Sequence, residues 1–287
     1  MKKQISTLII ICTCSVLSIG QRSDSLTSWK HWKTIVKGGS FYGSWGYNEE
    51  TYTHSNLYVV QPGMQNNYVF NNIRAQDRIG WDNLFNAQPT IPQYNYRLGY
   101  FFDKRQVWAI ELNFYHTKYV VEQGSDVRVN GEMHGKNVDT MVLLDNATLR
   151  YQLNNGANFF LFNLVRKITI VSTRDKKFVI DGLIKMGVGP VVPHVDNAIF
   201  DQQNRRQFQV GGWNTGIEAT LKMTFFKHVF IEYCNKLDYA RYSWLEIYGG
   251  RAHQNFGTYE NILNIGYTLH FHKVKPVETL VSPAPSR

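Results

Sequence analysis

Residues 211–239, GGWNTGIEATLKMTFFKHVFIEYCNKLDY, carry the clearest structural signal in the chain. Apolar and polar side chains alternate along them, so that Ile217 and Leu221 share one face while Glu218 and Lys222 share the other. Successive side chains of a β-strand point to opposite faces, and this period of two therefore predicts strands with one apolar and one polar face. The break at Lys227 predicts a hairpin between two such strands.

The same alternation recurs at residues 94–102, 107–122 and 259–271, and more weakly at residues 39–49, 56–61, 68–74, 141–153 and 178–189. The strong segments have about the 9 to 11 residues that a tilted strand needs to cross a bilayer. Counting all of them predicts an all-β fold, a closed antiparallel transmembrane β-barrel of about ten strands, with eight to twelve compatible with the pattern.

The N-terminal residues predict export. Lys2 and Lys3 precede an apolar run at residues 8–17, and polar residues follow from Gln21 onward. The run is too short for a membrane helix and fits a signal peptide over residues 1–20. A lipoprotein signal ending at Cys12 or Cys14 is an alternative, although neither follows a small residue.

Downstream of the signal, we expect an N-terminal periplasmic segment at residues 21–37, the barrel at residues 38–272 and a periplasmic tail at residues 273–287. Cys234 is the one cysteine left after cleavage, so an internal disulfide is not available.

Alternation does not say which face is inside, because a soluble barrel reverses the polarity and gives the same pattern. Aromatic residues make up 14% of the chain and charged residues only 18%. Tyrosine and tryptophan near the ends of apolar rows suit the interfacial girdles of a membrane barrel. We therefore expect the apolar rows to face lipid.

The segment containing Tyr267, Leu269 and Phe271 resembles the closing strand of small outer-membrane β-barrel proteins of Gram-negative bacteria. The resemblance implies an outer-membrane location and recognition by the barrel-assembly machinery. In that family the aromatic residue usually ends the chain, whereas residues 272–287 follow Phe271 here.

If the apolar rows face outward, the polar rows line the interior. They would bring together basic and acidic side chains in nearly equal number: Arg97, Arg150, Lys185, Lys222 and Lys236 with Glu111, Asp181, Glu218, Glu232, Asp238 and Glu260. Paired charges in a barrel of this size predict a packed, salt-bridged lumen and argue against a general diffusion porin.

Link lengths predict the orientation. Short links near residues 62–63, 104 and 227 are expected at the periplasmic side, and longer loops at residues 75–93, 123–139, 191–207 and 243–256 on the outside. Residues 154–177 depart from this scheme and are expected to form a periplasmic insertion, with the apolar run at residues 159–164 as a helix or a strand extension.

The expected partners are outer-membrane lipid and lipopolysaccharide, whose phosphates suit the basic residues of the loops, such as Lys118, Arg128, Lys136, Arg205, Arg206 and Arg251. We find no motif for nucleic acid, a cofactor or zinc, and the oligomeric state is open.

Two functions fit the sequence. The first is a non-enzymatic structural, surface-interaction or small-solute role. The alternative is a barrel enzyme, either a protease or one that modifies lipid A or phospholipid, with a histidine site at the rim. Its candidate residues are His116, His134, and His194 with Asp196, none with an identifiable nucleophile.

Overall fold

The computed structural model describes residues 39–78, 93–153 and 157–271, which belong to one compact unit of the chain. The predicted signal peptide (1–20), the N-terminal segment (21–37) and the tail (273–287) lie outside the described residues. No helix in the described ranges is long and apolar enough to cross a membrane.

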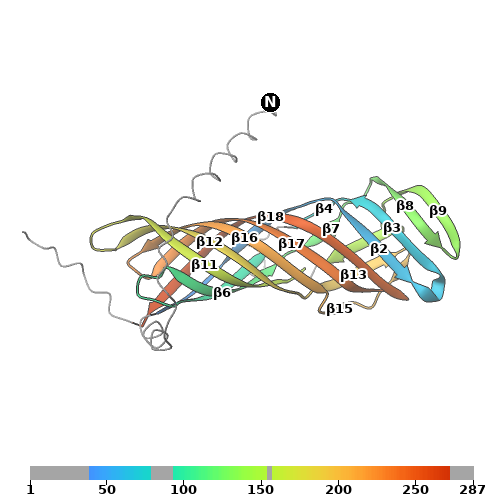
Figure 1. Ribbon diagram of the computed structural model, residues 1–287. Helices are drawn as coiled ribbons and strands as arrows, with labels where there is room; N and C mark the ends of the chain where they lie inside the picture. Colours follow the sequence, from blue (N-terminus) through green and yellow to red (C-terminus); the bar gives the residue numbers. More distant parts are fainter. Residues whose placement is uncertain (1–38, 79–92, 154–156, 272–287) are drawn as a thin grey trace, which may run out of the picture. The chain divides into compact units, whose positions relative to one another are not determined.

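Eight long strands pair in a ring, every one antiparallel to its neighbours (Figure 1). In order they are β1 (Ser40–Tyr52), β5 (Tyr94–Phe101), β6 (Trp108–His116), β11 (Phe159–Ser172), β12 (Phe178–Val191), β16 (Gly212–Phe225), β17 (Val229–Ile247) and β18 (Gly250–His270). β18 pairs with β1 from Ser40↔His270 to Tyr52↔Thr258, which returns the pairing to its start.

The ring strands meet short turns at the end where Ser40, Phe101 and His270 lie, which we call the lower end. Beyond the opposite end, further strands continue the ring as an upper sheet. They are β2 (Ser55–Gln61), β3 (Asn66–Ile73), β4 (Ala75–Gln76), β7 (Tyr119–Val121), β8 (Asp126–Met133), β9 (Lys136–Leu143), β10 (Leu149–Leu153), β13 (His194–Ile199), β14 (Gln202–Gln203) and β15 (Gln207–Phe208), with a 3-10 turn, η1 (Pro62–Met64), between β2 and β3.

The polarity of the two faces reverses along a single strand. In the lower half of β18, Leu263 and Ile265 point outward and are 58% and 55% exposed, whereas Glu260 points inward and is buried. In its upper half, Arg251 is the outward, exposed residue, and Phe256 points inward. The lower barrel is thus apolar outside and polar inside, and the upper sheet has the opposite arrangement.

The inward side chains of the upper sheet form an aromatic-rich apolar core. Phe256 stacks on Tyr119 with 4.4 Å between ring centroids and meets Tyr52 edge-on at 5.5 Å. Leu57 and Tyr151 belong to the same buried cluster. Burial of aromatic surface at this scale makes the upper sheet a folded extension of the barrel.

These observations confirm the antiparallel all-β prediction and correct its details. The ring has eight strands, at the lower limit of the predicted range of eight to twelve, because the predicted strands at residues 56–61, 68–74 and 141–153 belong to the upper sheet. The expected insertion at residues 154–177 contains a ring strand, β11.

The loop assignments also change. The link at residues 62–63 lies at the upper end, because β1 and β2 run upward one after the other before η1. The predicted loops at residues 123–139, 191–207 and 243–256 hold paired strands of the upper sheet and of the β17–β18 hairpin. Of the fourth, residues 75–93, the central part lies outside the described residues.

Candidate functional site

Five ring strands of the lower barrel each direct one charged side chain into a shared interior cluster. These residues, which we call the interior ion cluster, are Arg97 (β5), Glu111 (β6), Lys185 (β12), Glu218 (β16) and Glu232 (β17). All five are at most 2% exposed. The period of two places them inside, because their sequence neighbours are the outward apolar residues.

Lys185 lies at the centre of the cluster. Its Nζ atom is 3.0 Å from Glu111 Oε2, 3.2 Å from Glu218 Oε1 and 3.7 Å from Glu232 Oε2. Arg97 donates two hydrogen bonds to Glu218, from Nη1 to Oε1 at 2.7 Å and from Nη2 to Oε2 at 2.9 Å. Such a bidentate pair fixes both geometry and charge.

Two further lysines extend this arrangement along the barrel axis. Lys222 Nζ lies 3.4 Å from Glu232 Oε1 and 3.4 Å from the ring centroid of Phe230. Lys236 forms ion pairs with Asp238 and, at 3.2 Å, with Glu260 Oε1. Each of these buried ammonium groups therefore has a carboxylate partner, which is the condition under which buried charge is tolerated.

The interior is packed at this level. A water-filled channel would expose the polar side chains that line it, yet Arg97, Lys185 and Glu232 have no exposed surface. Tyr115 fills space between them and donates to Glu218 Oε2 at 3.2 Å while accepting from Arg97 Nη2 at 3.0 Å. The cluster therefore fills the interior of the lower barrel at this level.

The structure places most of the sequence-predicted lumen residues in the interior of the lower barrel, but not all. Arg150 lies on β10 in the upper sheet, where it donates to Asp196 at 3.0 Å, because β10 continues above β11. Asp181 faces inward near the lower end and accepts from Thr169 Oγ1 at 2.6 Å.

Sequence reasoning missed two interior groups, Lys167 and Glu50. The sequence predicts an insertion at residues 154–177, so it assigns Lys167 to no strand. In β11, Lys167 lies on the same inward face as Asn163 and Val165, both of which are buried. Glu50 continues the inward row of β1, where Asn48 donates to it at 2.6 Å.

The three candidate histidines lie apart from one another and none meets both an acid and a hydroxyl among the described residues. His116 Nδ1 is 3.1 Å from Asn158 Oδ1, and its ring stacks on Tyr94. His134 sits in the β8–β9 turn, where its backbone N–H donates to Asn66 Oδ1. His194 packs its ring against Phe208.

Asp196, the expected partner of His194, is held by arginines instead. Arg150 Nη1 and Arg206 Nε lie 3.0 and 3.1 Å from its two carboxylate oxygens. This arrangement is that of a structural ion pair, and it leaves the carboxylate without the role of orienting a histidine base. In the described ranges, no group of three His, Cys, Asp or Glu side chains is placed to hold a metal ion.

No protein-family model matches the chain, and no curated protein matches its sequence. Solved structures of outer-membrane proteins are similar to it. Ail, the attachment invasion locus protein of Yersinia pestis, in complex with the heparin analogue sucrose octasulfate, is 12% identical with a TM-score of 0.30, covering 81% of this chain and 99% of that chain.

OprG of Pseudomonas aeruginosa is 9% identical with a TM-score of 0.36, covering 81% of this chain and 96% of its own. The outer-membrane protease OmpT of Escherichia coli is 8% identical with a TM-score of 0.37, covering 82% of this chain and 97% of its own. With TM-scores this low, the assignment of the fold rests on the strand pairing and the outward apolar rows.

Proposed function

We propose that this chain is an outer-membrane β-barrel with a sealed interior, which displays the upper sheet at the cell surface in a non-enzymatic interaction role. The observation that carries the proposal is the reversal of polarity along the strands. On β18 the outward row from Tyr259 to Leu269 is apolar except at Asn261. Its length matches the roughly 9 to 11 residues of a tilted membrane strand. Above them the outward residues are polar, as on a surface that faces water.

The exposed apolar surface in the lower barrel is continuous between strands. Seven ring strands each contribute an apolar residue that is between 50% and 63% exposed: Leu98, Ile110, Phe162, Met186, Ile217, Leu237 and Leu263. A belt of this kind is incompatible with water, and a closed strand ring leaves no backbone hydrogen-bonding edge toward lipid. This supports a membrane location.

Lipopolysaccharide is the lipid partner that the charges above the belt favour. Arg241 and Arg251 are exposed outward-facing residues on β17 and β18, and Arg251 lies 5.2 Å from the ring centroid of Trp244. Arginine forms bidentate hydrogen bonds with phosphate, and tryptophan favours the membrane–water interface. Recognition by the barrel-assembly machinery and removal of residues 1–20 belong to the same proposal.

The strand β9 offers the contact surface for a protein partner. It pairs with β8 on one side and, within the described part of the chain, with no strand on the other. Met141 and Leu143 on this strand are 60% and 52% exposed. An unpaired edge of this kind can accept an extended segment as an added strand.

Cysteine labelling in intact cells tests the location and orientation. Met141→Cys on β9 should react with a membrane-impermeant maleimide in intact cells, whereas Lys176→Cys in the lower β11–β12 turn should react only after the outer membrane is permeabilised. The native Cys234 is buried and provides the background. Equal labelling of both variants, or labelling of Lys176→Cys first, would contradict the proposed orientation.

A proline variant tests the edge. His134 and Gly135 have φ values of 50° and 73°, as a two-residue type I′ hairpin requires, so Met133 and Lys136 form a hydrogen-bonded pair. By alternation, the N–H of Met141 faces the free edge and that of Val142 faces β8. Peptides that bind the native protein in nanodiscs can be selected from a display library. These peptides should not bind the Met141→Pro variant, because proline removes an N–H at the free edge and leaves the pairing with β8 intact. Retained binding would count against strand addition.

A further inference from the structure

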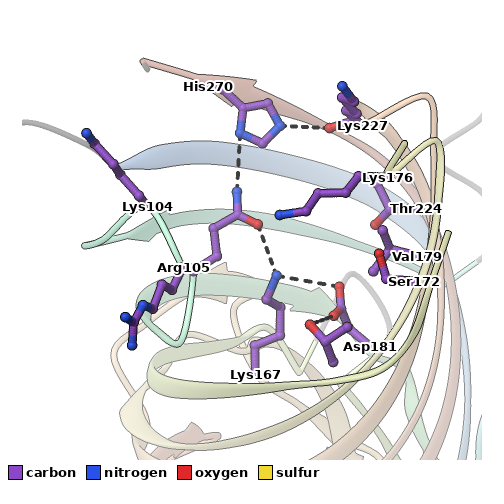
Figure 2. Close-up of a pocket in the computed structure, with 12 residues that line it drawn as sticks. Lys104, Arg105, Lys167, Ser172, Lys176, Val179, Asp181, Thr224, Lys227 and His270 are labelled. Atoms are coloured by element: carbon purple, nitrogen blue, oxygen red, sulfur yellow. Dashed lines mark hydrogen bonds and ion pairs between the residues drawn. The ribbon is translucent and has the colours of Figure 1, made fainter. Parts of the chain in front are cut away.

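The lower end of the barrel contains a basic cavity that the sealed-barrel function does not use. Its volume is about 340 Å³, within the lower part of the range of small-molecule sites. It is lined by residues of β11, β12, β16, the end of β18, and the β5–β6, β11–β12 and β16–β17 turns (Figure 2). It therefore lies in the mouth of the barrel, below the interior ion cluster.

The charges that line this mouth are strongly unequal. Five are basic, from Lys104, Arg105, Lys167, Lys176 and Lys227, and one is acidic, from Asp181. Lys167 already lies 3.6 Å from Asp181. Within the described ranges, the other four basic side chains form no ion pair, so the mouth holds an excess of positive charge.

The floor of the cavity is held by a chain of directed hydrogen bonds. Lys167 Nζ donates to Gln106 Oε1 at 3.0 Å, and Gln106 Nε2 lies 3.2 Å from His270 Nδ1. His270 Nε2 lies 2.7 Å from the Lys227 carbonyl oxygen, which can only accept, so this nitrogen carries the proton and Nδ1 accepts from Gln106. Lys167 is 10% exposed and is thereby fixed at the base.

The remaining donors are placed above this floor. Lys176 belongs to the β11–β12 turn, and Figure 2 shows its side chain extending across the cavity toward the side where Lys167 lies. Thr224 also lines the space, whereas the hydroxyl hydrogens of Thr169 and Ser172 are donated to Asp181 Oδ1 and to the Thr173 carbonyl oxygen. Cationic side chains around a small cavity, with the one carboxylate already paired, are the donor set that binds a phosphate group.

We propose that this lower mouth is an anion site for a phosphate group, with Lys176 as its principal cationic contact, Lys227 at its rim and Lys167 as its fixed base. The phosphate can come from a soluble phosphorylated molecule or from a lipid headgroup that reaches the rim. The same donors serve both sources, and the cavity is too small for a folded partner.

Binding of inorganic pyrophosphate tests the site, measured by calorimetry on the full-length protein folded in a maltoside detergent at low ionic strength. The double variant Lys176→Gln/Lys227→Gln should weaken binding about tenfold or more, because each lost contact is a charged hydrogen bond. Lys177→Gln is the matched control: it removes a charge from the same turn, but Lys177 pairs with Asp175 at 3.3 Å and does not line the cavity. Heat-dependent migration on gels verifies that each variant is folded.

Repeating the titration in nanodiscs separates the two sources. Competition by phosphatidylglycerol but not phosphatidylcholine would assign the site to a lipid headgroup, and equal binding in both would assign it to a soluble ligand. Absence of pyrophosphate binding by the native protein, or equal loss in Lys177→Gln and in the double variant, would overturn the proposal. These outcomes do not depend on the cysteine-labelling result.

Discussion

Replacing Arg97 with methionine should destabilise the barrel by about 3 kcal/mol, at the lower end of the range for breaking a buried ion pair. The native guanidinium makes two hydrogen bonds to Glu218 and one to Tyr115. It also contacts Glu232 Oε2 at 3.5 Å and Cys234 Sγ at 3.3 Å. Methionine fills most of the same space but offers no donor. In the native interior three cations, Arg97, Lys185 and Lys222, face three carboxylates, those of Glu111, Glu218 and Glu232. The variant keeps only two cations for the three carboxylates.

The loss of stability should stay near the lower end of that range, because each carboxylate that loses Arg97 keeps another cationic partner. Glu218 retains Lys185 at 3.2 Å and a hydrogen bond from Thr220 at 2.5 Å. Glu232 retains Lys185 at 3.7 Å and Lys222 at 3.4 Å. A carboxylate left without any cation would cost more.

The assay is the free energy of unfolding in urea, followed by tryptophan fluorescence of the protein folded into lipid vesicles. Arg74→Met is the control, because Arg74 is exposed on the upper sheet and has no ion pair among the described residues. The double variant Arg97→Met/Glu218→Gln leaves two cations facing two carboxylates. Its loss in the free energy of unfolding should therefore be smaller than the sum of the losses in the two single variants. Strict additivity, or a loss for Arg97→Met no greater than for Arg74→Met, would refute the ion cluster as a coupled unit.

Three more measurements address separate parts of the fold. Leu221→Arg, on the outward face, should destabilise the protein in lipid by about 2–4 kcal/mol more than Leu221→Ala; an equal effect would contradict lipid contact. Cys234 should resist maleimide in the folded protein and react fully in urea, and rapid reaction when folded would reveal an open interior. The hydrogen bond from Arg128 holds the pKa of Asp139 below its ordinary value of 3.8. Its contribution to the β8–β9 hairpin is present above that ordinary value and is lost as pH falls through the lowered pKa, so Arg128→Gln should raise the Asp139 pKa in an NMR titration.

The sequence predicted the lower barrel well where the two faces of a strand meet different surroundings. On β16, Ile217 and Leu221 face outward while Glu218 and Lys222 point into the interior, as their alternation indicates. The same holds for the lower half of β18. A period of two is visible whenever one face meets lipid and the other meets a polar interior.

Alternation disappears where both faces are apolar, and there the sequence misled. At the upper end of β11, Phe159 and Leu161 point inward into the apolar core, while Phe162 and Leu164 point outward and are exposed. A continuous apolar run results, which cannot be told from a buried helix by its pattern alone. For this reason the prediction of an insertion at residues 154–177 was wrong, and the sequence did not identify Lys167 as an interior residue.

The alternation of apolar and polar residues along the sequence was thus enough to predict the strands of the lower barrel, their outward apolar rows and the charged character of the interior. Only the tertiary structure decided that the ring closes with eight strands, that their polarity inverts above the belt, and that the histidines remain apart from acids. These properties depend on which strands become neighbours and on what surrounds each level of the barrel, and a local alternation of side chains carries no information about either.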